Sequence, residues 1–278
     1  MVPPSPEKRS PRSGANRLEF VDSHAHLDAP QFRTDLPRVL DRAFEAGVRR
    51  IVTIGVTPSS SRNSLELADK WPALVSAAAG YHPHWADGAN PDHLEQARRL
   101  AAHPAAVAVG EIGLDYRRKR SSRQAQLHLF DEMLSIAEET GKPIIVHDGQ
   151  AHADVLERLR THRALLAGGI IHCFSGDWRL ARTYLDWWFF LSIPGTVTYP
   201  HAQSTRQVAT KMPLDQMLVE TDAPHLTPVP RKGSRNEPAY LAHTIGAIAE
   251  LRGMELAEVA RKTAGNAVRA LRLPHAKI

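Results

Sequence analysis

Short apolar runs alternate with amphipathic stretches along most of this 278-residue chain. Nearly all residues within the runs are apolar, as in strands that are buried on both faces of a parallel sheet. The runs predict eight strands, at Leu18–Asp22, Arg50–Val56, Leu74–Gly80, Ala106–Gly110, Pro143–Val146, Gly169–Ile171, Trp188–Ile193 and Gln216–Glu220. Between them, apolar residues recur every three or four positions, which predicts helices. These include Asp35–Ala46, Ser60–Lys70, Asp92–Ala102, Arg123–Thr140 and His152–Arg163, followed by a longer helical region at Ala239–Leu273.

Eight strands that alternate with helices predict an α/β fold of the (β/α)8 TIM-barrel type. Gly47 and Gly141 stand where two of the expected helices should end. An open, doubly wound sheet is the alternative architecture. Against it, no Gly-x-Gly-x-x-Gly turn follows the first strand, and the chain contains no Walker-type phosphate loop. We therefore expect residues 18–278 to form a single barrel domain.

Composition separates a short leader from this domain. Residues 1–17 are rich in proline, serine and basic residues, and we expect them to be a disordered leader. Four basic residues against one acidic residue give +3 in residues 1–18, which leaves +2 of the net +5 for the other 260 residues. Charge alone therefore does not indicate a polyanionic partner.

The composition also gives an indication of the cellular compartment. The chain has one cysteine, Cys173, so an intrachain disulfide is impossible. The leader has no apolar segment of the kind found in secretory signals, and no apolar stretch is long enough to span a bilayer. We expect a cytoplasmic monomer that does not bind membranes.

Potential metal ligands follow several predicted strands: His24, His26, Glu111, His147, His172 and Asp222. They would gather at the carboxyl ends of the strands, where α/β barrels carry out their chemistry. His24 and His26 are two residues apart, so both side chains point the same way in an extended chain. Each residue also has a simpler explanation. Glu111 could form a salt bridge with Arg117 or Arg118, and the histidines could be hydrogen-bonded core residues.

Four histidines and two carboxylates suit two ions better than one, since a catalytic zinc site usually takes three protein ligands and a water. Two ions about 3.5–4 Å apart are the usual arrangement for phosphoester hydrolysis. These ligands accept Zn, Mn, Mg, Fe or Ni, so the sequence does not fix the metal. Asp222 is placed to act as a ligand, as a base for a water molecule, or as the cap of the next helix.

Several motifs surround these residues in a fixed order: VDSHAHLD at 21–28, GYHPH at 80–84, VGEIGLDY at 109–116, IIHCFSG at 170–176, LVETDAPHLTP at 218–228 and NEPAYL at 236–241. With them the chain resembles, from about residue 19 to 273, the TatD family of metal-dependent deoxyribonucleases, which are amidohydrolase-like barrels. The resemblance implies two divalent ions and hydrolysis of phosphodiester bonds in DNA, typically from a 3′ end. It implies two ligand sets bridged by Glu111: His24, His26 and Asp222 for one ion, and His147 and His172 for the other. It also implies that His82 faces the substrate.

The chain departs from the family after His147. There the family usually reads Ser-Arg-Asp/Glu-Ala, whereas this chain reads Asp148-Gly149-Gln150-Ala151 and lacks the arginine. The basic run 117–120, which begins with Arg117, could hold substrate phosphates or be a solvated loop. Trp85 could stack on bases, as could Trp178, although we expect packing for both. We expect Cys173 to point away from the site, into the core.

Three functions remain open from the sequence. A two-metal hydrolase acting on DNA, with Asp222 relaying a proton and Glu111 bridging the ions, fits best. The missing arginine keeps a deacylase or lactonase of the amidohydrolase type in view, although such enzymes often bridge their metals with a carboxylated lysine rather than a glutamate. A barrel that only binds, without catalysis, is the third possibility, and the presence of all the candidate ligands argues against it.

Overall fold

The computed structural model describes residues 18–162 and 168–273. Parallel strands run through these residues, and each strand hydrogen-bonds to the next one in the chain. They are β1 (Phe20–Ala25), β2 (Val48–Ile54), β3 (Val75–Ala79), β4 (Ala106–Asp115), β5 (Ile144–Gly149), β6 (Ile170–Ile171), β7 (Phe190–Ile193) and β8 (Met217–Val219). The segment after β8 returns to β1, where Ala223 forms a bridge with Ala25. The predicted (β/α)8 barrel is confirmed. The expected leader and Arg163 lie outside the described residues.

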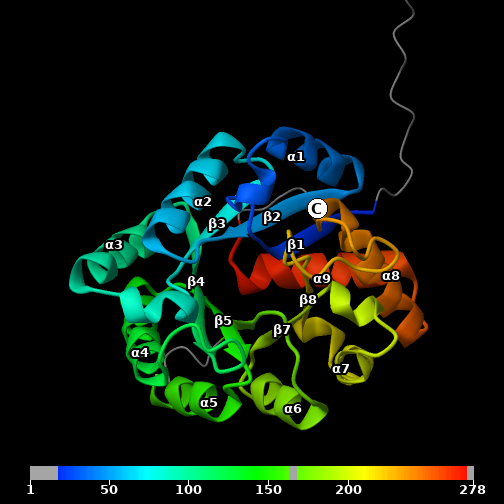
Figure 1. Ribbon diagram of the computed structural model, residues 1–278. Helices are drawn as coiled ribbons and strands as arrows, with labels where there is room; N and C mark the ends of the chain where they lie inside the picture. The colour runs from blue at the N-terminus through cyan, green and yellow to red at the C-terminus, as the bar shows by residue number, and fades with distance from the viewer. Residues whose placement is uncertain (1–17, 163–167, 274–278) are drawn as a thin grey trace, which may run out of the picture.

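Helices surround the strands as a ring (Figure 1). They are α1 (Leu36–Glu45), α2 (Pro58–Lys70), α3 (Pro91–Ala102), α4 (Arg123–Thr140), α5 (His152–Thr161), α6 (Trp178–Asp186), α7 (Gln203–Lys211), α8 (Leu241–Arg252) and α9 (Leu256–Ala270). Four begin at side-chain caps, and Gly141 ends α4 in the left-handed conformation. Short 3-10 helices lie in the loops, among them η2 (Pro83–Gly88). In the described part of the chain, no helix is both long and apolar enough to cross a membrane.

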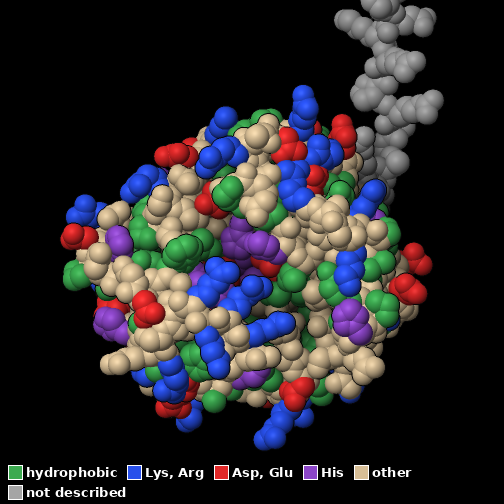
Figure 2. Space-filling model, in the orientation of Figure 1, with side chains coloured by type: hydrophobic (Ala, Val, Ile, Leu, Met, Phe, Trp, Pro, Cys, Tyr) green, Lys and Arg blue, Asp and Glu red, His purple; other side chains and the backbone are tan. Residues whose placement is uncertain are grey.

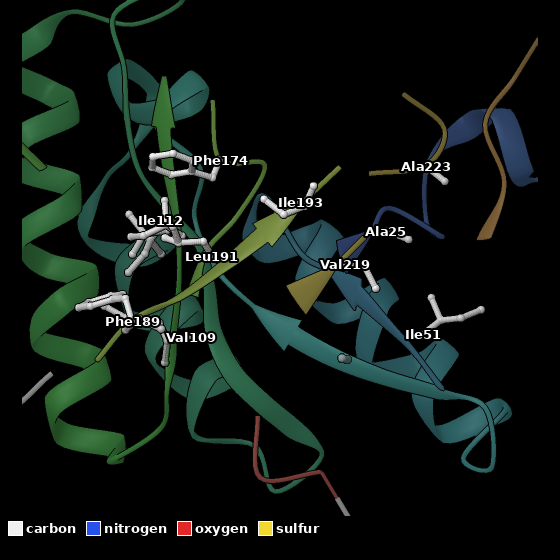
Figure 3. Packing of buried hydrophobic residues seen from close by; sticks show 14 of the residues in the cluster. Ala25, Ile51, Val109, Ile112, Phe174, Phe189, Leu191, Ile193, Val219 and Ala223 are labelled. Carbon is white, nitrogen blue, oxygen red and sulfur yellow. The ribbon is translucent and has the colours of Figure 1, made fainter. Parts of the chain in front are cut away.

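Two apolar layers hold the barrel together. The outer layer lies between strands and helices, and Figure 3 shows part of it, including Phe189, Leu191 and Ile193 along the β7 segment. The inner layer consists of strand residues that point to the barrel axis, together with Ala264 and Ala267 of α9. Helix α9 runs across the barrel behind the strands in Figure 1. It therefore covers the amino-terminal end of the barrel, and the carboxyl ends of the strands form the open mouth.

Strand alternation carries the inner layer up to this mouth. Ile145, Ile170 and Leu218 belong to the inner layer, and the residues two positions later are His147, His172 and Glu220. Because side chains two apart on a strand share a face, these polar residues point into the barrel above the apolar layer. Three strands also continue further than predicted: β1 includes His24, β4 includes Glu111 and β5 includes His147. These residues lie within their strands rather than beyond them.

Among the other boundaries that differ from the prediction, two have a clear local cause. The strand expected from Trp188 begins only at Phe190, because Trp188 has a left-handed φ of 64° and ends α6. Its N–H donates to the Leu185 carbonyl, and the next N–H donates to Tyr184, which is a helix-ending turn. The helical region near the end of the chain is two helices, because Gly253 (φ 60°) ends α8 with the same kind of turn.

Candidate metal centre and active site

The first set of converging side chains joins β1, β4 and the segment after β8. It consists of His24 Nε2, His26 Nε2, Glu111 Oε2 and Asp222 Oδ1. Neighbouring atoms in this set lie 3.3–3.9 Å apart. A tetrahedral shell of ligands about 2.1 Å from an ion has neighbouring atoms about 3.4 Å apart. The spacing of this set therefore fits a divalent cation at its centre.

The second set gathers on the other oxygen of the same carboxylate. Glu111 Oε1 lies 2.9 Å from His147 Nδ1, 3.0 Å from His172 Nε2 and 3.3 Å from His82 Nε2. The ring of His172 also stacks on that of His24, with centroids 3.7 Å apart, so His172 borders both sets. The structure thus brings all six predicted ligands together. It also places His82, expected to face substrate, among the ligand atoms.

Burial favours the neutral form of every group here, but opposite charges outweigh burial for most of them. Asp222 and Glu111 raise the pKa of His26 to about 9 despite its burial. Burial alone would raise the pKa of Glu111 and of Asp222. His172 and His82 nevertheless hold the pKa of Glu111 well below its usual range, and His26 lowers the pKa of Asp222 to about 2. Burial lowers the pKa of His82 itself to about 4. At neutral pH the ion-free site therefore pairs ionised carboxylates with protonated histidines.

Cations can take the place of those protons. Histidine binds metals in its neutral form, so metal binding to such a site releases protons. Nitrogen and carboxylate ligands together suit several divalent ions. The composition and spacing of both sets therefore fit the metal pair that the sequence led us to expect, with Glu111 shared between the sets.

A buried glutamate that the sequence analysis missed supports His172. Glu220 is fully buried, and its Oε1 lies 3.1 Å from His172 Nδ1, on the far side of the ring from Glu111. Metal-binding histidines usually donate their second ring nitrogen to such a carboxylate, which fixes the ring and its tautomer. Strand alternation was the available signal, because Glu220 precedes Asp222 by two residues.

Asp115 has the same role on the other side of the site. Its Oδ2 lies 3.2 Å from His147 Nε2 and 2.7 Å from His84 Nε2. The pKa of Asp115 is lowered despite its burial, chiefly by hydrogen bonds from these two histidines. Burial opposes a charge on His147, but its bonds to Asp115 and Glu111 raise the pKa of His147 to about 9. The sequence analysis missed this pairing too, because it depends on how β4 and β5 align.

The position of the absent family arginine is tightly enclosed in this structure. A Cβ atom at Gly149 would lie only 2.6 Å from Asp115 Cγ and 2.9 Å from His147 Nε2, so a larger residue would displace Asp115. The Gly149 carbonyl accepts N–H bonds from Tyr116 (2.8 Å) and Arg117 (3.1 Å). The backbone of Arg117 therefore lies directly against the position where the family has its arginine.

A nearby carboxylate is engaged elsewhere, and one further residue lies in a different position from that expected. Asp22 is not aimed at the ligand atoms, because its carboxylate accepts bonds from Thr221 and the His24 N–H. Cys173, expected in the core, is only partly buried and has φ 48°, which breaks the strand alternation after His172. Burial and then the nearby acidic groups raise the pKa of its thiol.

The two tryptophans in the loops at the barrel mouth differ in burial. Trp178 packs against the core as expected. Trp85 does not, because 52% of its surface is exposed. The prediction that both pack is therefore wrong for Trp85.

Comparison with known proteins identifies the family of this chain. The model of the TatD related DNase family matches residues 21–272. A metal-dependent hydrolase named TatD from Mycobacterium tuberculosis is 42% identical over 258 residues, covering 90% of this chain and 97% of its own. The 3′-5′ ssDNA/RNA exonuclease TatD of Erwinia tasmaniensis is 35% identical over 259 residues, covering 91% and 100%.

A solved structure agrees with these relatives. The crystal structure of YjjV, a TatD homologue from Escherichia coli K12, has a TM-score of 0.86 and 32% identity, and covers 92% of this chain and 99% of its own. The resemblance inferred from the motifs is confirmed across the barrel. The chain belongs to the TatD related DNase family and is a metal-dependent hydrolase.

Proposed function

We propose that this protein binds two divalent ions and hydrolyses phosphodiester bonds in DNA, removing nucleotides from a 3′ end. The observation that carries the proposal is the position of Glu111. Its two oxygens face two separate groups of histidine nitrogens at 2.9–3.9 Å, which is the geometry of a carboxylate that bridges two ions. Relatives named 3′-5′ ssDNA/RNA exonucleases support the substrate class and the polarity.

Each ligand has a defined task in this proposal. His24, His26 and Asp222 would hold one ion, and His147 and His172 would hold the other. His82 is close enough to Glu111 to act as a further ligand or to contact the substrate. Bound divalent ions supply Lewis-acid stabilisation of the charge that develops on the phosphate and make a water molecule easier to deprotonate.

Residues of the chain itself would accept the proton and balance the negative charge of the substrate. Asp222 keeps its charge, because its pKa is about 2, and only 13% of its side chain is exposed at the mouth. We assign it the proton released by the attacking water. The backbone of Arg117 lies beside Gly149 and its side chain is exposed, so we assign to its guanidinium the role of the arginine that the family pattern has two residues after the ligand histidine. Glu220 and Asp115 keep His172 and His147 in the correct orientation.

The test is a nuclease assay on single strands labelled at the 3′ or the 5′ end, with Mg²⁺, Mn²⁺ and Zn²⁺ in turn and a chelator control. We expect ion-dependent shortening from the 3′ end, abolished by Asp222→Asn and unchanged by the exposed control Glu250→Gln. Loss of the family arginine motivates parallel assays on amides and lactones. Turnover of those compounds, with intact oligonucleotides under every ion, would replace this proposal with an amidohydrolase activity.

A further inference from the structure

A buried glutamine near the start of α4 holds the end of β4. Gln126 is only 1% exposed and lies four residues after Ser122, the N-cap of that helix. Its Oε1 accepts the backbone N–H of Asp115 at 2.7 Å, and its Nε2 donates to the Asp115 carbonyl at 3.1 Å. One side chain therefore engages both backbone polar groups of the residue that bonds to His147.

Strand β4 needs this support because it extends beyond its neighbour on one side. Its pairing with β3 ends at Val109, whereas its pairing with β5 continues to Asp115, opposite Gly149. The N–H of Tyr116 points to β5 and donates to the Gly149 carbonyl, so the polar backbone groups of Asp115 point to the other side, beyond the end of β3. Such groups are costly when they are buried without partners. Gln126 supplies the partners that a longer β3 would have provided.

The same amide joins the two ends of the loop between β4 and α4. Besides the Asp115 carbonyl at the beginning of this loop, Gln126 Nε2 donates to the Ser121 carbonyl at its end, at 2.9 Å. The amide thereby uses its oxygen and both of its N–H groups, which fixes its orientation. The exposed cations of residues 117–120 lie between these two ends. Lys and Arg side chains gather beside histidines over the middle of the barrel (Figure 2).

Asp115 transmits this constraint to the candidate metal centre. Its Oδ2 lies 3.2 Å from His147 Nε2 and 2.7 Å from His84 Nε2. The other ring nitrogen of His147, Nδ1, faces Glu111 at 2.9 Å. A shift of the Asp115 backbone would therefore turn the imidazole that is expected to bind the second ion.

We infer that Gln126 is a positioning residue, which fixes His147 through Asp115 and thereby sets the affinity of the ion assigned to His147 and His172. Groups behind a metal ligand tune its affinity because they fix the ring and its tautomer. Within the described part of the chain, the side chain of Gln126 bonds to Asp115 and Ser121 and to no metal ligand, so its effect must pass through the residues that it holds. The inference rests on the proposed function, since it concerns the second of the two ions assigned there.

Calorimetric titration of the chelator-treated protein with Mn²⁺ measures the affinities of both ions. His147→Ala removes a ligand and so identifies the binding step that belongs to its set. Gln126→Met keeps the length of the side chain and removes its hydrogen bonds. We expect it to weaken that step about 10-fold, the lower end of the range for groups that orient a metal ligand. The other binding step should be unchanged.

Gln216 provides a matched control at the opposite end of the barrel. It directly precedes β8, and its Nε2 donates to the carbonyls of Leu185 and Phe189 at 3.0 and 3.1 Å, so it also holds a loop through its amide. Gln216→Met should lower the free energy of unfolding in urea, as Gln126→Met does, but leave both ion affinities unchanged. If Gln126→Met does not fold, Gln126→Glu replaces it, because it keeps the acceptor for the Asp115 N–H and loses only the two donors.

A double-mutant cycle tests the route through Asp115. In an Asp115→Ala background His147 has lost this carboxylate, so the addition of Gln126→Met should weaken the second ion no further. Additive losses would overturn the inference, because Gln126 would then act by another route. An unchanged ion affinity in the folded single variant Gln126→Met would overturn it as well.

Failure of the proposed function would look different, because the wild-type protein would then bind fewer than two ions or leave DNA intact. In that case the ion-free protein still decides whether Gln126 positions His147. The nitrogen chemical shift of His147 Nε2 reports its hydrogen bond to Asp115. A change of this shift in Gln126→Met that is absent from Gln216→Met supports the inference, and identical shifts in both variants reject it.

Discussion

Replacing Glu111 with glutamine tests the centre of the site with minimal change in shape. The carboxylate faces five imidazole nitrogens at 2.9–3.9 Å and has a side-chain exposure of only 3%. In the ion-free protein the protonated members of that group, such as His147 and His172, depend on its charge. Removing one partner of a buried ion pair leaves the other charge uncompensated, which typically costs about 3–5 kcal/mol. We expect Glu111→Gln to lower the free energy of unfolding by about that amount.

Urea denaturation with a chelator measures this loss at pH 7, and a second series at pH 10 checks its cause. The pKa of His147 is about 9, so this histidine becomes neutral at the higher pH and its share of the loss should disappear. Elemental analysis of the purified variant should also show that both ions are lost, because each set uses one Glu111 oxygen. Glu250→Gln, on the exposed face of α8, should change neither quantity. Full ion content together with wild-type stability in Glu111→Gln would refute the bridging geometry.

Three further predictions concern protons, orientation and chemistry. The raised pKa values of His26 and His147, both about 9, mean that their charge pairs stabilise the ion-free protein fully below pH ~6.5 and lose that contribution as pH rises through 9. Ion binding should tighten over the same interval and release protons, which calorimetry in two buffers with different ionisation enthalpies detects; a pH-independent affinity would contradict it. Glu220→Gln should weaken ion binding about 10- to 100-fold in a competition titration, with an unchanged circular dichroism spectrum. Asp222→Asn should lower kcat about 10²- to 10⁴-fold even at saturating ion, and equal turnover would remove Asp222 as the proton acceptor.

The sequence predicted the barrel and the convergence of its ligands for one physical reason. Parallel strands place their carboxyl ends at one end of a barrel, so polar residues that end apolar runs must meet there. Pro-Ile-Ile-Val before His147 and Gly-Ile-Ile before His172 are clear examples. Strand alternation alone then fixes which neighbours share the inner face, and it places Glu220 beside these residues as well.

Alternation fails where the backbone leaves the extended conformation. Cys173 follows His172 and should point away from the site into the core, but its φ of 48° breaks the alternation and leaves it only partly buried. His82 precedes the turn of η2, so only the folded turn reveals that its Nε2 lies within 3.3 Å of Glu111. Trp85 was assigned to the core because tryptophan is usually buried, yet the same turn leaves it exposed. Each of these three features arises in a turn or loop whose dihedral angles the residue pattern does not encode.

The arginine missing after His147 is best understood together with Asp115. His84 and His147 already occupy Asp115 Oδ2 with hydrogen bonds, at 2.7 and 3.2 Å, so this oxygen is not free to pair with a residue at position 149. The space is also taken, since even one added carbon at Gly149 would contact the Asp115 carboxylate. Positive charge instead comes from the loop that begins at Arg117, whose backbone donates to the Gly149 carbonyl. Under the proposed function, the departure from the family pattern would move the substrate-facing charge from β5 to the end of β4 and leave the metal ligands in place.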